Sequence, residues 1–307
     1  MAKQKIFMTG ASGYIGSVTA QLALARGYEV YGISRTEATD AKLTGLGVVP
    51  VRGDLESLDV LREQSARADI VLHLADAFAG LQTNYDEVLR LDAGAISAFE
   101  AGMEGSDKPF VTTSGTLVVE ATGAETTEES PLCEKPLNDR IKSEQNALRL
   151  REKGIKVSAI RLAPFVYGQG GSGVRLFTQM FAGAGEAVYV DDGAAVTSAV
   201  HVDEAAELYL LAVERAQAGE VFNGVSNIVT FRELTEAIGE TAGLPVRSAP
   251  ADEVAGKWGE FVMKFLSTEN QASGAKAKRV LGWDPKAARI VDDVKHGSYA
   301  RSEYKQR

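Results

Sequence analysis

Cysteine is nearly absent from this sequence of 307 residues, and histidine is scarce. The single cysteine, Cys133, has no partner within the chain, so a disulfide-stapled fold is excluded and a cytoplasmic location is expected. The three histidines, His73, His201 and His296, lie far apart and match no ligand spacing of a metal site. We therefore expect no bound metal.

Long uncharged hydrophobic runs are also lacking. No stretch approaches the roughly 18 apolar residues that would cross a membrane, and the N-terminal MAKQKIFMTG lacks the apolar segment of a secretory signal. The net charge is −9, from 33 basic and 42 acidic residues, and an acidic surface repels phosphate backbones. The sequence therefore predicts neither a membrane protein nor a nucleic-acid-binding protein.

Short apolar runs alternate with helical patterns through the first half of the chain. In the first expected helix, apolar residues recur at three- and four-residue steps. Strands separated by helices are typical of βαβ units, which predict an α/β fold with a Rossmann-type, doubly wound parallel sheet. The expected strands are 5–9, 29–33, 48–51, 70–74, 110–113 and 157–162, and the expected helices are 14–26, 55–66, 85–103 and 137–153.

The regular alternation weakens after Pro164, where glycine-rich segments appear. One of them, 168–173, is either a lid over a site or an ordinary surface loop. We expect a small, discontinuous C-terminal lobe that binds the substrate. The expected division is a dinucleotide-binding domain at 1–163, to which 193–225 return, and a substrate-binding lobe at 164–192 and 226–307.

A glycine triplet directly follows the first expected strand. Gly10, Gly13 and Gly16 stand in TGASGYIG, where glycine permits a tight turn, close approach of the backbone to phosphate, and close packing of helix on strand. The free N–H groups that begin a helix then bind a pyrophosphate. Because the strand and the helix are both present around the motif, the sequence predicts a dinucleotide site, which also includes Ser12, Tyr14 and Ile15.

Ser34 and Arg35 directly follow the second expected strand, at the position that selects the nucleotide. A protein that prefers NAD usually has an acidic residue there, bound to the ribose 2′-hydroxyl. Arg35 can instead pair with a 2′-phosphate, and Ser34 can add a hydroxyl. We expect NADP(H) to be preferred over NAD(H), unless Arg35 is simply a solvated surface residue.

Motifs along the whole chain resemble those of the extended short-chain dehydrogenase/reductase family, in its NAD(P)-dependent epimerase/dehydratase group. They are TGASGYIG at 9–16, GDL at 53–55, HLA at 73–75, a serine at 114, HVDEAA at 201–206 and LGWDP at 281–285. The resemblance implies that Asp54 and Leu55 lie against the adenine, and that the chain forms a homodimer. It also implies that the cofactor path is lined by Leu74 and Ala75, to which we add Pro164. Asp203 is expected to cap the helix that HVDEAA opens.

In this family a Ser, a Tyr and a Lys act together, with the Tyr and Lys on one helical face as Y-x-x-x-K. The Lys holds the nicotinamide ribose and lowers the pKa of the Tyr, whose phenol then exchanges a proton with the substrate oxygen. The resemblance assigns Ser114 and Lys142 to the Ser and the Lys. The residue four positions before Lys142 is Asn138, which is neither an acid nor a base near neutral pH.

Three explanations of Asn138 stay open on the sequence. The proton could come from water or from another tyrosine, such as Tyr85 or Tyr167. The protein could instead bind NADP(H) without turnover, as a sensor or scaffold. The helix could also be misaligned by some residues, although the 24 residues from Ser114 to Asn138 argue against this. We expect an NADP(H)-dependent oxidoreductase, with a redox-neutral epimerase or dehydratase as a further alternative.

Aromatic residues near the expected nicotinamide site could line a substrate pocket. Beyond Arg175, few cations lie on the candidate loops, whereas a sugar nucleotide usually requires cations for its diphosphate. We therefore expect an uncharged small-molecule carbonyl or alcohol, or a related unsaturated compound, as the substrate. The residues expected to contact it are Phe78, Tyr85, Phe165 and Tyr167.

Overall fold

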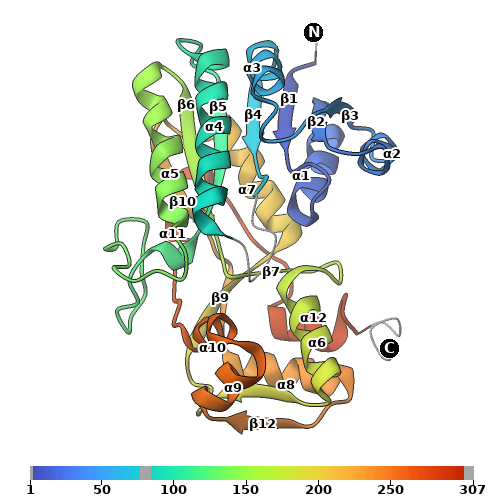
Figure 1. Ribbon diagram of the computed structural model, residues 1–307, viewed down its shortest axis with the longest axis vertical. Coiled ribbons are helices and arrows are strands. Elements are labelled where there is room, and N and C mark those ends of the chain that lie inside the picture. Colours follow the sequence, from blue (N-terminus) through green and yellow to red (C-terminus); the bar gives the residue numbers. More distant parts are fainter. Residues whose placement is uncertain (1–2, 77–83, 301–307) are drawn as a thin grey trace.

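The protein, described here by a computed structural model over residues 3–76 and 84–300, is built on one parallel sheet (Figure 1). The order of its seven strands is β3-β2-β1-β4-β5-β6-β10, so the chain leaves β1 toward one edge and later continues from β4 toward the other. This is the doubly wound, Rossmann-type fold that the sequence predicts. The strands are β1 (Lys5–Thr9), β2 (Glu29–Ser34), β3 (Val49–Arg52), β4 (Ile70–His73), β5 (Pro109–Gly115), β6 (Lys156–Leu162) and β10 (Glu220–Gly224).

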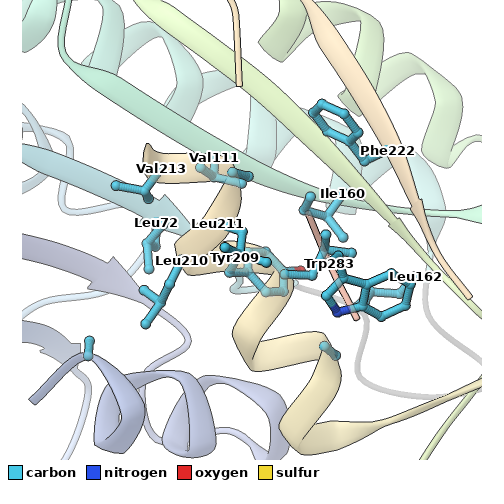
Figure 2. Close-up of a cluster of buried hydrophobic side chains, with 14 of the residues drawn as sticks. Leu72, Val111, Ile160, Leu162, Tyr209, Leu210, Leu211, Val213, Phe222 and Trp283 are labelled. Carbon is cyan, nitrogen blue, oxygen red and sulfur yellow. The ribbon is translucent and has the colours of Figure 1, made fainter. Parts of the chain in front are cut away.

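Helices cover both faces of this sheet, because alternate side chains of each strand point to opposite faces. Ile6 and Met8 of β1 pack with the helices on one face, whereas Phe7 packs on the other. Figure 2 shows the first of these two clusters, in which Tyr209 packs beside the side chains of the sheet. The first face carries α1 (Tyr14–Ala25) and α7 (Val202–Arg215), and the second carries α3 (Leu58–Arg67), α4 (Tyr85–Met103) and α5 (Arg140–Leu148).

A smaller lobe lies at one end of the sheet domain and has its own aromatic core (Figure 1). Phe165, Phe177 and Phe265 pack there with ring centroids 5.6–5.8 Å apart. Two small sheets, β11-β9-β7 and β12-β8, complete the lobe. Strand β9 lies in the first of them, although it falls within the range 193–225 expected to return to the dinucleotide domain. Its elements are β7 (Phe165–Tyr167), α6 (Ser172–Ala184), β8 (Ala187–Val190), β9 (Val196–His201), β11 (Asn227–Thr230), α8 (Phe231–Ala242), β12 (Val246–Ala249), α9 (Ala251–Trp258), α10 (Glu260–Ser267) and α12 (Ile290–His296).

One late segment packs on the sheet domain rather than on the lobe, although it falls within the predicted lobe range 226–307. Helix α11 (Ala275–Leu281) contacts α7 and β10, and Trp283 is buried in the cluster of Figure 2. The indole N–H of Trp283 donates a hydrogen bond of 2.9 Å to the carbonyl of Glu204 on α7. The short elements that remain are α2 (Glu37–Gly45), η1 (Thr116–Val118) and η2 (Arg149–Lys153).

Three helices begin at residues other than those expected, one of which is α3, expected from residue 55 and observed from Leu58. Helix α7 is capped by His201, whose ring Nδ1 accepts from the backbone N–H of Asp203 at 3.2 Å, so the prediction that Asp203 is the cap is wrong. Helix α5 begins at Arg140, three residues later than predicted, because the side chain of Asn138 accepts from the N–H of Arg140 at 3.2 Å. Asparagine favours such a local turn over helix.

No helix among residues 3–76 and 84–300 is both long enough and apolar enough to span a bilayer.

Candidate active site

The glycine triplet forms a turn that leaves no space for side chains. Gly10 has a φ of +75°, and a Cβ there would lie 2.7 Å from the backbone nitrogen of Ala75. A Cβ on Gly16 would lie only 2.0 Å from the carbonyl oxygen of Gly10. Helix α1 begins directly after Gly13, so its first N–H groups lie at the end of β1. These residues fit the pyrophosphate of a dinucleotide, which such helix N-termini bind.

The first turn of α1 also contacts the glycine-rich loop 168–173. The Tyr14 hydroxyl donates to the carbonyl of Gly168 at 2.7 Å, and its ring lies where a Cβ on Gly171 would be. The Tyr299 hydroxyl donates to the carbonyl of Gly171 at 2.8 Å and accepts from the N–H of Gly168 at 2.9 Å. The glycine triplet and the first turn of α1 together form the phosphate cradle. The loop 168–173, expected to be either a lid or a surface loop, is therefore hydrogen-bonded to this cradle through Tyr14.

At the end of β2, Arg35 is exposed, and the structure gives it no ion pair with any described residue. Ser34 is buried and donates to the carbonyl of Thr36 at 3.2 Å. Another cation nearby, Arg52, is already bonded to the carboxylate of Asp40. Arg35 is thus available to an anion at the position where the sequence predicts the 2′-phosphate.

Asp54 and Leu55, predicted to lie against the adenine, follow β3. The Asp54 carboxylate accepts from the N–H of Glu56 and of Ser57, each at 3.0 Å, and from the Ser57 hydroxyl at 2.8 Å. Leu55 packs partly buried against the core on the α4 face of the sheet. Asp54 therefore orders the turn into α3, and its contact with adenine stays a prediction.

A cavity of about 790 Å³ opens at the carboxyl ends of β4 and β5, between the sheet and the lobe. In open α/β sheets, ligands bind at this edge, where the strand order reverses. Seven residues predicted from the sequence line the cavity: Ile15, Leu74, Ala75, Tyr85, Ser114, Asn138 and Pro164.

The opposite wall of the cavity is apolar, and its part from α9 and α10 was not predicted from the sequence. It is formed by residues of α6 and of the α9–α10 hairpin, namely Leu176, Phe177, Met180, Trp258, Phe261, Val262 and Phe265. The pattern EFVMKFLS at 260–267 places apolar residues at three- and four-residue steps, a signal of an amphipathic helix that could have found α10.

Ser114 ends in the cavity as a buried hydroxyl with no internal partner. It is 3% exposed, and its Oγ has no hydrogen bond with any residue that the structure describes. A buried hydroxyl without a partner costs about 1–3 kcal/mol. A hydrogen bond to a polar group of a bound molecule would remove this cost. Ser114 is therefore placed to bind a polar group of the substrate or the cofactor.

Lys142 does not lie in the cavity, in contrast to the prediction. Its side chain is 61% exposed, and its Nζ is 2.6 Å from a carboxylate oxygen of Asp139. Arg140 lines the cavity instead. Residues two positions apart on a helix point in directions about 200° apart around its axis. With Arg140 turned into the cavity, Lys142 therefore faces outward. The residue four positions before Arg140 is Pro136, so no tyrosine precedes the inward cation either.

Arg140 belongs to a charged cluster on the floor of the cavity. Its guanidinium donates to the carboxylate of Asp76. Asp92 on α4 lies 3.1 Å from Nε2 of His73, whose Nδ1 is 2.7 Å from the Thr9 hydroxyl. Burial acts to raise the pKa of Asp92, but the hydrogen bond and charge of His73, with smaller contributions from its other neighbours, outweigh burial and lower the pKa. Asp92 is therefore ionised at neutral pH.

The four residues predicted to contact substrate have different fates. Tyr85, the first residue of α4, lines the cavity. Tyr167 is fully buried in the lobe, where its hydroxyl donates to the carbonyl of Ala288 at 2.6 Å, and Phe165 packs in the core of the lobe. Neither residue lines the cavity. Phe78 lies outside the described residues.

Comparison with known proteins places this site in a family. Residues 6–224 match the model of the NAD dependent epimerase/dehydratase family. The chain belongs to this family. The predicted resemblance to the epimerase/dehydratase group of the extended short-chain dehydrogenases/reductases is confirmed, and a nicotinamide dinucleotide is the class of cofactor of this family.

The matches described next cover between 71% and 97% of the chain. An uncharacterized protein of Schizosaccharomyces pombe is 33% identical over 96% of this chain and 99% of its own. The 4-hydroxy-2-methyl-3-oxo-4-farnesyl-3,4-dihydroquinoline-1-oxide ketoreductase of Stigmatella aurantiaca is 27% identical over 71% of this chain and 67% of its own. The UDP-glucose 4-epimerase of Thermotoga maritima, solved with UDP-glucose, has a TM-score of 0.77 over 97% of this chain and 98% of its own. Its 22% identity supports the fold alone.

Proposed function

We propose that this protein is an NADP(H)-dependent oxidoreductase that interconverts an uncharged, largely apolar carbonyl compound and its alcohol. The observation that carries this proposal is the buried Ser114 hydroxyl, which has no described partner and lies in an apolar cavity beside the glycine cradle. The similarity to the Stigmatella aurantiaca ketoreductase supports the same class of reaction.

Preference for NADP(H) is supported by Arg35. No acidic side chain ends β2 to bind a ribose 2′-hydroxyl, and Arg35 is exposed without an ion pair to any described residue. A guanidinium binds phosphate in a two-pronged, charge-assisted arrangement. In this proposal Arg35 holds the 2′-phosphate, and the N–H groups at the start of α1 hold the pyrophosphate.

The charges around the cavity support an uncharged substrate. Among the described lining residues Arg140 is the one arginine or lysine, and Asp76 already pairs with it. A sugar nucleotide would bring a diphosphate toward this pair and toward the ionised Asp92. Like charges repel strongly in such a partly buried site. An apolar molecule, in contrast, would gain the free energy of covering the wall made by α6 and α10.

Ser114 acts on the reacting carbonyl in this proposal. The bound cofactor supplies a hydride for reduction, or accepts one in the reverse direction. The Ser114 hydroxyl donates a hydrogen bond to the substrate oxygen, which gains negative charge as the carbon is reduced. The apolar wall around it excludes water, which strengthens that hydrogen bond.

The test is NADPH oxidation with 2-decanone and decanal as apolar probes. UDP-glucose, which has no carbonyl to reduce, is the contrasting substrate, and its conversion in the presence of NADP⁺ is followed by chromatography. Turnover is expected with the apolar carbonyls and not with UDP-glucose. Ser114→Ala is expected to lose about 10²–10³ in kcat, the usual effect of removing one such donor. Ser248→Ala, at an exposed serine of β12 outside the cavity, is the matched control and is expected to retain wild-type kcat. Turnover of UDP-glucose but not of the carbonyls would contradict the proposal.

A second function, binding of NADP(H) without turnover, is favoured by one observation. No tyrosine stands four residues before either Lys142 or Arg140, where the family has its proton donor. This function requires tight NADPH binding together with no oxidation of NADPH by any carbonyl probe. The assay above therefore separates the two functions.

We also propose that the protein is a homodimer and that it is cytoplasmic. In this proposal the sheet domain binds the dinucleotide and the lobe binds the substrate. Sedimentation of the purified protein tests the dimer directly.

A further inference from the structure

The cavity contains a phenol that no described residue engages. Tyr85 is half-buried and is the one tyrosine among the described residues that line the cavity. No hydrogen bond of its hydroxyl to a described residue is present, whereas the Tyr167 hydroxyl bonds to Ala288 and the Tyr209 hydroxyl lies 2.7 Å from Thr113. Tyr85 therefore resembles Ser114, since both offer a hydroxyl to whatever occupies the cavity.

The position of Tyr85 follows from the packing of two helices. Tyr85 is the first residue of α4, and Arg140 is the first residue of α5. These helices pack side by side on one face of the sheet, and their first turns lie at the edge where the cavity opens (Figure 1). The phenol and the guanidinium consequently meet in the cavity, although they come from different helices.

Four charged groups surround the phenol. Arg140 and Asp139 face it from the start of α5, Asp76 from the segment after β4, and Asp92 from α4 itself. Burial raises the pKa of Tyr85 to about 12, with the three carboxylates adding to the rise and Arg140 opposing it. The phenol is therefore protonated throughout the neutral range, which is the state of a proton donor.

We propose that Tyr85 is the catalytic proton donor of this site, in place of the tyrosine that α5 lacks. The inference rests on the proposed function, carbonyl reduction with NADPH. As the carbonyl carbon receives the hydride, the C=O π bond opens and its electron pair moves to the oxygen. That oxygen takes the proton of the Tyr85 hydroxyl, and the resulting phenolate regains a proton from water. The ketone is reduced to an alcohol, and NADPH is oxidised to NADP⁺.

The other groups in the cavity are less suited to this step. Arg140 does not release its proton in proteins, Asp92 is ionised at neutral pH, and an amide such as Asn138 is not an acid. Arg140 is instead a positioning residue, whose charge stabilises the phenolate that proton transfer leaves. The Ser114 hydroxyl holds the substrate oxygen, while Tyr85 supplies the proton.

The first test is Tyr85→Phe in the intact protein, with 2-decanone and NADPH as the probes. Loss of general acid catalysis is expected to lower kcat about 10²–10⁴-fold. The Kd for NADPH, measured by calorimetry, is expected to stay within about twofold, because the phenol acts on the substrate. Tyr28→Phe removes a phenol beside the opposite end of the sheet, just before β2, and is expected to leave kcat unchanged.

The second test measures the pH dependence of kcat in the reverse reaction, oxidation of 2-decanol with NADP⁺. This direction needs the phenolate, whose fraction rises tenfold per pH unit below the pKa of Tyr85. The kcat of wild type is therefore expected to rise steadily from pH 7 to pH 9, and that of Tyr85→Phe to lose this dependence. A purely structural role of Tyr85 would not change the pH profile.

The outcomes separate the inference from the function on which it rests. Wild-type turnover with Tyr85→Phe equally active, or with the same pH profile in both proteins, overturns the role of Tyr85 and leaves the oxidoreductase intact. Wild type that binds NADPH but reduces none of the carbonyl probes overturns both. Selective loss of kcat and of the pH dependence in Tyr85→Phe supports the inference.

Discussion

Substitution of Gly16 by alanine is expected to abolish measurable NADPH binding. The added Cβ would lie 2.0 Å from the carbonyl oxygen of Gly10, a backbone atom that cannot rotate away. Helix α1 must then move off the end of β1, and its first N–H groups lose their alignment on the pyrophosphate. We expect the Kd for NADPH to rise at least about 100-fold, equivalent to about 2.7 kcal/mol.

A matched glycine in another helix provides the control for this substitution. Gly183 lies inside α6, and a Cβ there would meet nothing within 4 Å. Gly183→Ala is expected to bind NADPH as wild type does and to gain stability by up to about 1 kcal/mol, because alanine favours helix. Calorimetric titration with NADPH measures the Kd of both variants. Wild-type affinity in Gly16→Ala would contradict the assignment of the glycine triplet to the pyrophosphate site.

Neutralising Glu144 is expected to cause the largest loss of stability. Glu144 on α5 and Arg161 on β6 are 2% and 5% exposed and form a two-pronged ion pair with N···O distances of 2.7 and 2.9 Å. Glu144→Gln leaves the buried guanidinium without its counter-charge, which typically costs about 3–5 kcal/mol. Because this pair anchors α5 to the sheet, Arg140 and Asn138 are expected to lose their positions as well.

Urea unfolding of Glu144→Gln and of Glu63→Gln measures this effect. Glu63 pairs with Arg67 on the exposed surface of α3, so its substitution is expected to cost only about 0–1 kcal/mol. The double variant Glu144→Leu/Arg161→Met is expected to recover much of the lost free energy, since both charges are then removed. Equal stability of Glu144→Gln and wild type would show that the ion pair does not anchor α5.

The sheet and the cradle could be predicted because their signals are local. Strands buried on both faces appear as short apolar runs, and the helices between them carry apolar residues at helical steps. The glycine triplet encodes its own geometry, since Gly16 is required by a contact only six residues away, at Gly10. Ser114 could likewise be found because the end of a strand fixes its place.

Which residues of α5 face the cavity could not be predicted from the sequence. For this reason Lys142 was expected in the cavity, where the structure has Arg140. Nothing in NDRIKSE alone distinguishes a helix that begins at 137 from one that begins at 140. The side chain of Asn138 accepts from the N–H of Arg140 and so favours a turn before the helix, and the buried pair of Glu144 with Arg161 fixes which face turns inward. Arg161 lies 17 residues beyond Glu144, so this constraint comes from tertiary structure.

The apolar wall of the cavity is a second example of a non-local feature. Phe261 and Phe265 are distant in sequence from Ser114 and face the same space only because the lobe folds back over the sheet. Tyr85 was one of two tyrosines named from the sequence as a proton source, and only the fold distinguishes it from the buried Tyr167.

Calorimetric titration of wild type and of Arg35→Ala with NADPH and with NADH tests directly whether the protein binds a nicotinamide dinucleotide and whether Arg35 selects NADP(H). A charge-assisted hydrogen bond contributes about 1.5–3 kcal/mol, so wild type is expected to bind NADPH roughly 10–100-fold more tightly than NADH. Arg35→Ala is expected to lose that preference, while Arg279→Ala, an exposed arginine on α11, keeps it. Binding of neither nucleotide would contradict the dinucleotide site, and tighter binding of NADH by wild type would contradict the role of Arg35.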